Sequence, residues 1–122
     1  MILTTALIFI GALCNSVMDK ISFHHSKSVF KNMSDWWNPQ KSWKFKWKNG
    51  DPKQGEKFWL SSTWLVWTTD AWHLFKSLME MSLLVAVVTY SPTYYILLDL
   101  AIIFGIQAAT FHTFFTYIFN KK

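Results

Sequence analysis

The residues best suited to chemistry in this chain are a carboxylate and an imidazole spaced three apart, Asp70 and His73. An i,i+3 pair on a helix lies on one face, so Asp70 could orient His73 as a general acid or base. Lys76 follows one turn later and could bind an anionic group, and Asp19 is a second acid that could join them. Asp70, His73, Lys76 and Asp19 are therefore the catalytic candidates.

Two other interpretations of the same residues stay open. In the first, they are structural: Asp19 or Asp70 pairs with Lys76, and the histidines form hydrogen bonds at a wet interface. In the second, they hold a divalent metal, because carboxylate and imidazole are both zinc ligands. Two ligands at i,i+3 spacing are a weak signal without a HExxH motif. The candidate metal ligands are Asp70, His73, His24, His25 and His112.

Other chemistries lack support in the sequence. The chain has one cysteine, Cys14, and carries neither a Gly-rich phosphate loop nor a GxSxG motif. ATP-driven and thiol-based reactions are therefore disfavoured, and no intrachain disulfide can form.

The elements that position these residues follow from the distribution of apolar and charged residues. Of the 122 residues, 52% are hydrophobic and only 16% are charged, and the two kinds occur in separate blocks. Such separation is typical of a chain that is partly in a membrane and partly in water. The sequence thus predicts an all-α membrane protein, a single membrane domain over 1–122.

Three apolar stretches predict three transmembrane helices. The first covers about 2–23 and the third about 94–119, after the turn Ser91-Pro92-Thr93. The second should end near Tyr90 and is expected to begin near Ser62. The alternative is that 62–75 lies at the interface and the chain bends near Lys76.

Polar residues follow one face of the first two predicted helices. In the second helix five of them fall within an arc of about 120°. Polar groups are costly in hydrocarbon, so the two stripes are expected to pack together. The stripes are Gly11, Asn15, Asp19, Ser22 and Ser26, and Asp70, His73, Lys76, Ser77 and Glu80.

Two intramembrane acids stand apart from this cluster. Glu80 is expected near mid-membrane, where Lys76 at i−4 is its expected partner, and Asp99 near the outer end of the third helix. An alternative is a proton or ion pathway through Asp99, Glu80 and Asp70.

The interfacial loop between the first two helices, about 24–61, is rich in Trp and Lys. Alternating aromatic and basic residues there predict an extended segment, or a short helix by i,i+4 spacing. Beside membrane helices, anionic lipid headgroups are a better partner for them than nucleic acid. The candidate headgroup-binding residues are Trp43, Lys44, Lys46, Trp47 and Lys48.

Lysines set the expected orientation. All 12 basic residues are Lys; nine lie from Lys20 to Lys57, two at the C-terminus and none in the turn 91–93. The positive-inside rule then places the loop and the C-terminus in the cytoplasm and the N-terminus outside.

The runs SWKFKWKNGDPKQGEKFW and TDAWHLFK, with MDKISFHHSKSVF before them, resemble small integral membrane proteins of bacteria and their phages. The resemblance covers roughly residues 18 to 76. It implies a bacterial inner membrane and no particular activity. It adds Trp72 to the residues of first interest.

We therefore expect a small polytopic membrane protein that is a non-catalytic scaffold, accessory or regulatory subunit. Three helices of this length cannot shield two polar stripes alone, so a homo-oligomer or a larger membrane complex is expected. The alternatives are an interfacial enzyme or headgroup-binding protein that uses the Asp/His/Lys cluster, and an oligomeric ion or proton conductor.

Overall fold

The computed structural model describes residues 1–121, and its long helices confirm the all-α class. They are α1 (Ile2–Phe23), α3 (Ala71–Thr89) and α4 (Ile96–Thr113), which continues in a π-helical turn (Phe114–Ile118). Each is long and apolar enough to cross a membrane. The three predicted membrane helices are therefore present.

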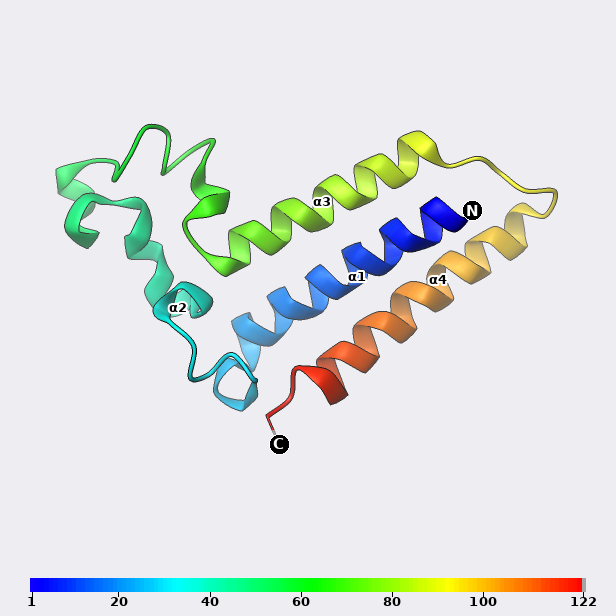
Figure 1. The fold of residues 1–122 in the computed structure, drawn as a ribbon, viewed down its shortest axis with the longest axis horizontal. Helices are drawn as coiled ribbons and strands as arrows, with labels where there is room; N and C mark the ends of the chain where they lie inside the picture. The colour runs from blue at the N-terminus through cyan, green and yellow to red at the C-terminus, as the bar shows by residue number, and fades with distance from the viewer. Residues whose placement is uncertain (122) are drawn as a thin grey trace.

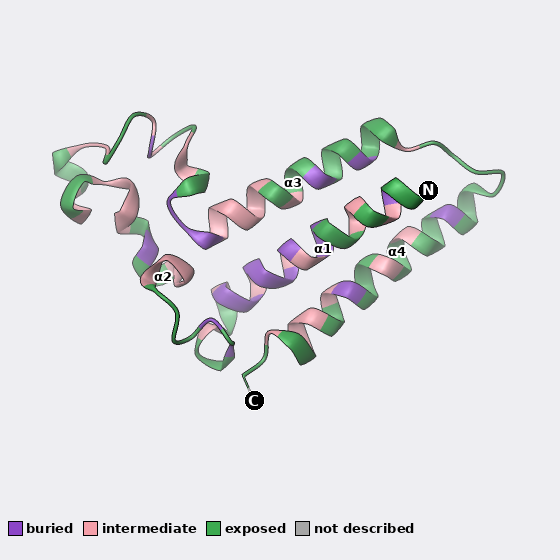
Figure 2. Cartoon of the chain, in the orientation of Figure 1, coloured by how far each residue is buried: buried purple, intermediate pink, exposed green. Residues whose placement is uncertain are grey.

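Helix α1 lies between the other two long helices (Figure 1). Helix α3 runs antiparallel to it on one side, and α4 runs parallel to it on the other. Gly11 of α1 allows close approach, since a Cβ there would lie 3.3 Å from Leu83 Cδ2 of α3. On the other side Phe9 meets Phe114 at 5.9 Å between ring centroids. Burial accordingly concentrates on α1, while α3 and α4 expose most of their length (Figure 2).

An apolar cluster closes the end of the bundle where α1 finishes. Val17 and Ile21 of α1 pack there with Phe30 and Ala71. The C-terminal segment joins the same end, because the Val29 amide donates to the Phe119 carbonyl at 2.9 Å. The long loop and the C-terminus therefore share one end of the bundle, as the predicted helices require. Partly buried aromatic residues surround the cluster: Trp36, Trp37, Trp72, Phe75 and Phe119.

The loop is compact and built from short turns rather than from an extended strand. Helix α2 (Pro39–Ser42) leads directly into a 3₁₀ turn, Trp43–Lys46. The prediction of an extended segment is therefore wrong for Trp43–Lys46. The alternative prediction, a short helix, is closer, but the helical turn ends at Lys46 and does not include Trp47. The chain then folds back, with the Lys57 amide donating to the Lys46 carbonyl at 3.0 Å. Further 3₁₀ turns cover His25–Lys27, Asp35–Trp37, Lys48–Gly50, Pro52–Gln54 and Val66–Thr68.

The second long helix begins at Ala71, not at Ser62 as expected. Thr68 and Thr69 turn their hydroxyls onto the carbonyls of Leu65 and Val66, at 2.8 and 2.6 Å. Such local bonds compete with helical ones, so the preceding segment forms turns. The alternative bend near Lys76 is also absent from the described chain, because α3 is continuous from Ala71 to Thr89.

Candidate functional site

The predicted acid–imidazole pair forms at the start of α3. Asp70 is buried and caps the helix, its Oδ1 accepting the His73 amide at 2.7 Å. The His73 Nδ1 lies 2.9 Å from Oδ1 and 2.8 Å from Oδ2 of the same carboxylate. Nδ1 therefore donates to Asp70, and Nε2 is the atom that can accept or release a proton.

The Trp/Lys segment of the loop covers this pair. A small cavity of about 90 Å³ lies between α2, the following turn and the start of α3. Two candidate headgroup-binding residues, Trp43 and Lys46, thus line the same cavity as the catalytic candidates Asp70 and His73. Lys46, His73 and the buried Asp70 therefore border one small space. Its lining residues are Pro39, Ser42, Trp43, Lys46, Asp70, Trp72 and His73.

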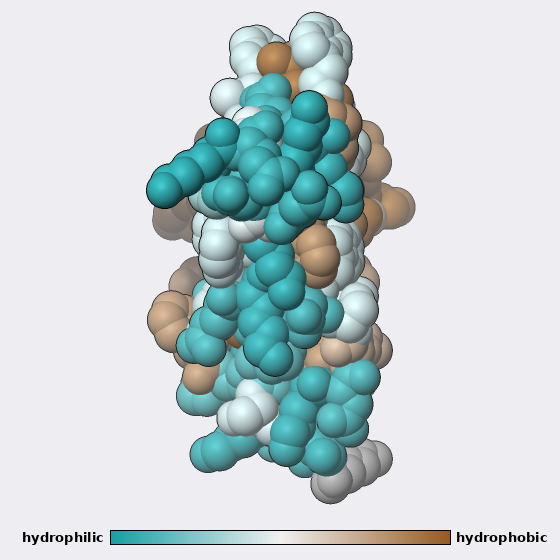
Figure 3. Space-filling model, turned by 90° about the vertical axis from the view of Figure 1, so that its left-hand side faces the viewer, coloured by the Kyte–Doolittle hydropathy of each residue, from teal (hydrophilic) through white to brown (hydrophobic). Residues whose placement is uncertain are grey.

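The other headgroup candidates lie outside this cavity. Trp47 and Lys44 line a second hollow of about 400 Å³ on the loop. The Lys44 ammonium lies 3.5 Å from the Asp35 carboxylate, and Lys48 is exposed. Seen from the loop end, the molecule presents a largely hydrophilic surface (Figure 3).

Two catalytic candidates do not join the site. The Lys76 ammonium lies 5.2 Å from the centroid of the Trp72 ring, a cation–π contact. It forms no ion pair with an acid among residues 1–121, so its expected pairing with Asp70, Asp19 or Glu80 is wrong. Asp19 is half-buried on α1 and does not line the cavity.

The histidines do not converge on a metal site. His24 packs edge-on against Phe115 at 5.5 Å, and His112 is exposed on α4. Burial and the charge of Lys41 lower the pKa of the half-buried His25 imidazole. Within the described chain, no three His, Cys, Asp or Glu side chains are placed to hold a metal ion. The physical reason is that α1 separates α3, with His73, from α4, with His112 (Figure 1).

The polar stripe of α3 faces away from α1, contrary to expectation. Ser82 and Ala86 are buried, and Leu83 contacts Gly11 of α1. Glu80 is exposed, and none of the described residues forms a salt bridge with it. The two stripes therefore do not pack together, and a carboxylate is left on the outer surface of a membrane helix.

Asp99 has a structural setting at the opposite end of the bundle. Only 2% exposed, it accepts hydrogen bonds from Tyr90 Oη at 2.7 Å and from the amide and hydroxyl of Thr93 at 2.9 and 2.6 Å. The hydrogen bond from Tyr90 to Asp99 raises the pKa of Tyr90, and burial and the negative charge of Asp99 raise it further. Asp99 thus holds the turn before α4. Asp70 caps the start of α3, Glu80 lies at its middle, and Asp99 binds Tyr90 beyond its end. The three acids are therefore too far apart to form a continuous chain of contacts.

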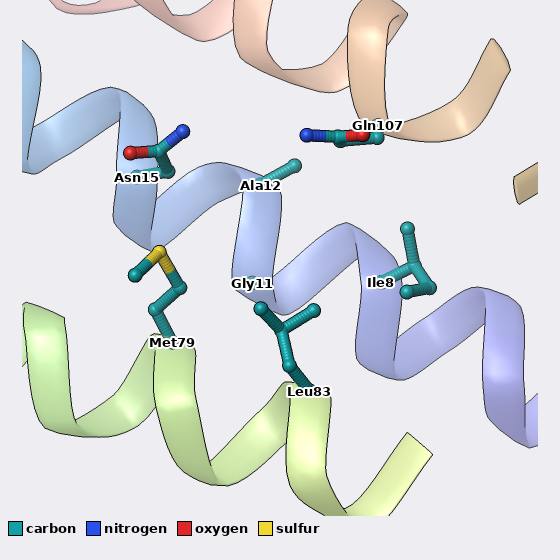
Figure 4. Close-up of a pocket in the computed structure, with 7 residues that line it drawn as sticks. All are labelled: Ile8, Gly11, Ala12, Asn15, Met79, Leu83 and Gln107. Atoms are coloured by element: carbon teal, nitrogen blue, oxygen red, sulfur yellow. The ribbon is translucent and has the colours of Figure 1, made fainter. Parts of the chain in front are cut away.

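A groove over α1 carries two further polar groups. It has a volume of about 210 Å³ and runs between α1, α3 and α4. Asn15 of α1 and Gln107 of α4 both line it with their amides (Figure 4). The first stripe therefore opens into a groove that all three long helices border. The other lining residues are Ile8, Gly11, Ala12, Met79 and Leu83.

Sequence reasoning missed the most exposed aromatic residues of the loop end. Trp59 is 78% exposed and Trp64 is 82% exposed, and Phe58 and Trp67 are also exposed. Tryptophan is enriched where membrane meets water, so these rings suit that boundary. The signal is the run FWLSSTWLVW, whose second half falls in the segment that the sequence predicts as the start of the second helix.

Comparison of the chain with protein-family models, with curated proteins and with solved structures finds no match.

Proposed function

We propose that this chain is a non-catalytic subunit of an oligomeric membrane assembly. The observation that carries the proposal is the position of Glu80. Nine helical residues of α3 stand on either side of it, between Ala71 and Thr89, and its side chain faces outward. A membrane helix with a carboxylate at its centre needs a partner for that group.

Glu80 costs the lone chain free energy that a partner subunit can offset. An acidic side chain at the centre of a membrane helix costs about 2.5–3.5 kcal/mol on insertion scales. Glu80 is about 13 Å of helix from either end of α3, more than two turns, so its short side chain cannot reach water. The expected internal partner, Lys76, is engaged with the Trp72 ring. A neighbouring subunit that supplies a hydrogen-bond donor would offset the cost.

The proposed location is a bacterial inner membrane. The Lys-rich loop and the C-terminus lie at one end of the bundle, since the Lys121 amide donates to the Lys27 carbonyl at 2.7 Å. The positive-inside rule favours the cytoplasm for that end. Exposed Trp59 and Trp64 would lie at the boundary, and the lysines would contact anionic headgroups.

Counting subunits tests the proposal. The labelled chain is extracted with its surrounding lipid into polymer nanodiscs, and photobleaching steps and native mass are recorded. We expect more than one chain, or a chain with a partner protein, in each disc. Glu80→Leu should shift the population toward the lone chain, whereas Val87→Leu, on the same exposed side, should not. The proposal would be refuted if wild-type discs held single chains and if a water-soluble maleimide labelled a Glu80→Cys variant, because position 80 would then be in contact with water.

A second candidate function is binding of an anionic headgroup, with or without acid–base chemistry by His73. The observation that favours it is the cavity where Lys46 and Trp43 meet Asp70 and His73. Native mass spectrometry with phosphatidylglycerol should show weaker retention by Lys46→Ala than by Lys53→Ala, whose side chain is exposed outside the cavity. Equal retention would exclude the cavity as the binding site.

A further inference from the structure

We infer that the partner at Glu80 is a second copy of this chain, with α3 of one copy packed against α4 of the next and Glu80 paired with the partner subunit's His112. The inference rests on the proposed function and names its interface. It makes the assembly a head-to-tail row or ring of identical subunits.

The first support is the arrangement of the helices. Helices α3 and α4 lie on opposite sides of α1, so they form opposite edges of the molecule (Figure 1). A second copy placed beside the first, in the same membrane orientation, therefore brings α4 against α3. Contacts of this kind use two different surfaces and repeat from copy to copy.

The second support is depth. Ala71 and Phe119 pack in the same apolar cluster, which places the inner ends of α3 and of the α4 segment at one level. Glu80 is nine residues from Ala71, about 13 Å along the helix. His112 is seven residues from Phe119, at most about 10 Å because Phe114–Ile118 is π-helical and rises less per residue. The two side chains thus lie within one helical turn of the same depth.

The third support is the direction of the two side chains. Ser82, two residues from Glu80, is buried, and Thr110, two residues from His112, is buried as well. Two residues of helix turn the side chain by about 200°, so Glu80 and His112 lie nearly opposite the faces that pack on α1. Both are exposed.

The fourth support is chemical complementarity. A carboxylate and an imidazole can share a proton, as an ion pair or as a neutral hydrogen-bonded pair, and either form removes an unpartnered group from hydrocarbon. A two-fold contact between two copies of α3 would instead place Glu80 against another carboxylate. A two-fold contact between two copies of α4 would place two imidazoles together. Of the three contacts, only the head-to-tail one pairs an acid with a base.

Both surfaces also leave room for close approach. Beside Glu80, α3 and Trp67 border a hollow of about 470 Å³ that could receive the imidazole. On α4 the side of His112 carries Ala108 and Gly105, both exposed, and nothing lies within 4 Å of a Cβ built on Gly105. Small residues let helix backbones approach closely in membranes. The hollow is lined by Trp67, Leu74, Ser77, Leu78, Glu80, Met81 and Leu84.

Cysteine cross-linking in lipid nanodiscs tests the interface. In a Cys14→Ser background, one chain carries Leu84→Cys on the exposed side of α3 and another carries Phe104→Cys on the exposed side of α4. A head-to-tail contact predicts cross-links when the two chains are mixed and few when either is alone. Cross-links within a single variant, or none in discs that hold several copies, would overturn the interface and leave the proposed function standing. Lone chains with no partner would overturn both.

A charge-exchange experiment tests the pair itself. Glu80→Leu and His112→Leu should each weaken association about threefold to thirtyfold, the range for one interhelical hydrogen bond. The double variant Glu80→His with His112→Glu should restore association, because the pair is rebuilt in reverse. Thr113→Leu, exposed next to His112, is the matched control. Equal losses in the double variant and the single variants would overturn the pairing.

Discussion

Replacing Asp99 should open the turn that connects α3 with α4. The carboxylate accepts three hydrogen bonds, one from Tyr90 and two from Thr93. A hydrogen bond to a charged group contributes about 1.5–3 kcal/mol, so the lower end for three bonds is about 4.5 kcal/mol. Thr93 is exposed and Tyr90 half-buried, so water replaces part of that loss. We therefore expect Asp99→Ala to lower the free energy of unfolding by about 3 kcal/mol.

A graded series separates the contacts from the charge. Asp99→Asn keeps one acceptor oxygen and should cost about 1 kcal/mol. Both variants remove a negative charge from the first turn of α4, a smaller term of about 0.3–1 kcal/mol. Ser91→Ala, exposed in the same turn, is the matched control and should leave stability unchanged.

Two measurements check this prediction. Steric trapping in bicelles gives the free energy of unfolding for each variant. Titration of the Tyr90 ring by NMR gives its pKa, which should fall toward the ordinary tyrosine value when Asp99 no longer accepts its hydroxyl. An Asp99→Ala protein with wild-type stability and an unchanged Tyr90 pKa would refute the assigned role.

Three further predictions concern other parts of the fold. Asp70→Ala should destabilise α3 by about 1–2 kcal/mol through loss of its N-cap, seen as faster hydrogen exchange of the His73 amide, which Asp70→Asn should largely preserve. Gly11→Leu should separate α1 from α3 and cost about 2 kcal/mol, whereas Gly11→Ala needs only a small shift of Leu83; equal stability of both variants by steric trapping would contradict that contact. The pKa of His25 is lowered in the folded chain, so on acidification the imidazole is protonated first in the unfolded turn. The contribution of His25 to stability is therefore complete above pH 6.5, the ordinary pKa, and is lost as the pH falls below that value. Hydrogen exchange in the turn His25–Lys27 should accelerate on acidification, and His25→Asn should remove that dependence.

The membrane helices could be predicted because their signal is local. Ile2–Phe23 and Ile96–Ile118 are continuous apolar runs, and Pro92 with its neighbours marks the turn between the last two helices. The shared end of loop and C-terminus followed from the number of helices alone. The start of α3 was harder to predict, because it is set by hydrogen bonds of the threonine hydroxyls and of Asp70, which hydrophobic periodicity does not reveal.

The site divides in the same way. The Asp70–His73 pair is an i,i+3 contact within one helix, so its spacing predicts it. Its meeting with Lys46 depends on how α2 and the next turn fold back, which no local pattern gives. The proposed convergence of histidines failed because the order of helices across the bundle is a tertiary property. A sequence with three apolar helices does not state which one lies in the middle.

The headgroup site and the self-association surface can be separated by experiment, although both use α3. His73 and Glu80 are seven residues apart, about 10 Å along the helix, beyond direct hydrogen bonding. They also have different surroundings, a small cavity beside Trp43 and a hollow beside Trp67. Double-mutant additivity holds for sites at such separation without shared partners. We therefore expect His73→Ala to change lipid retention but not subunit number, and Glu80→Leu to do the reverse. If either variant changed both lipid retention and subunit number, lipid binding at the cavity and subunit association at Glu80 would be coupled along α3 and could not be separate functions.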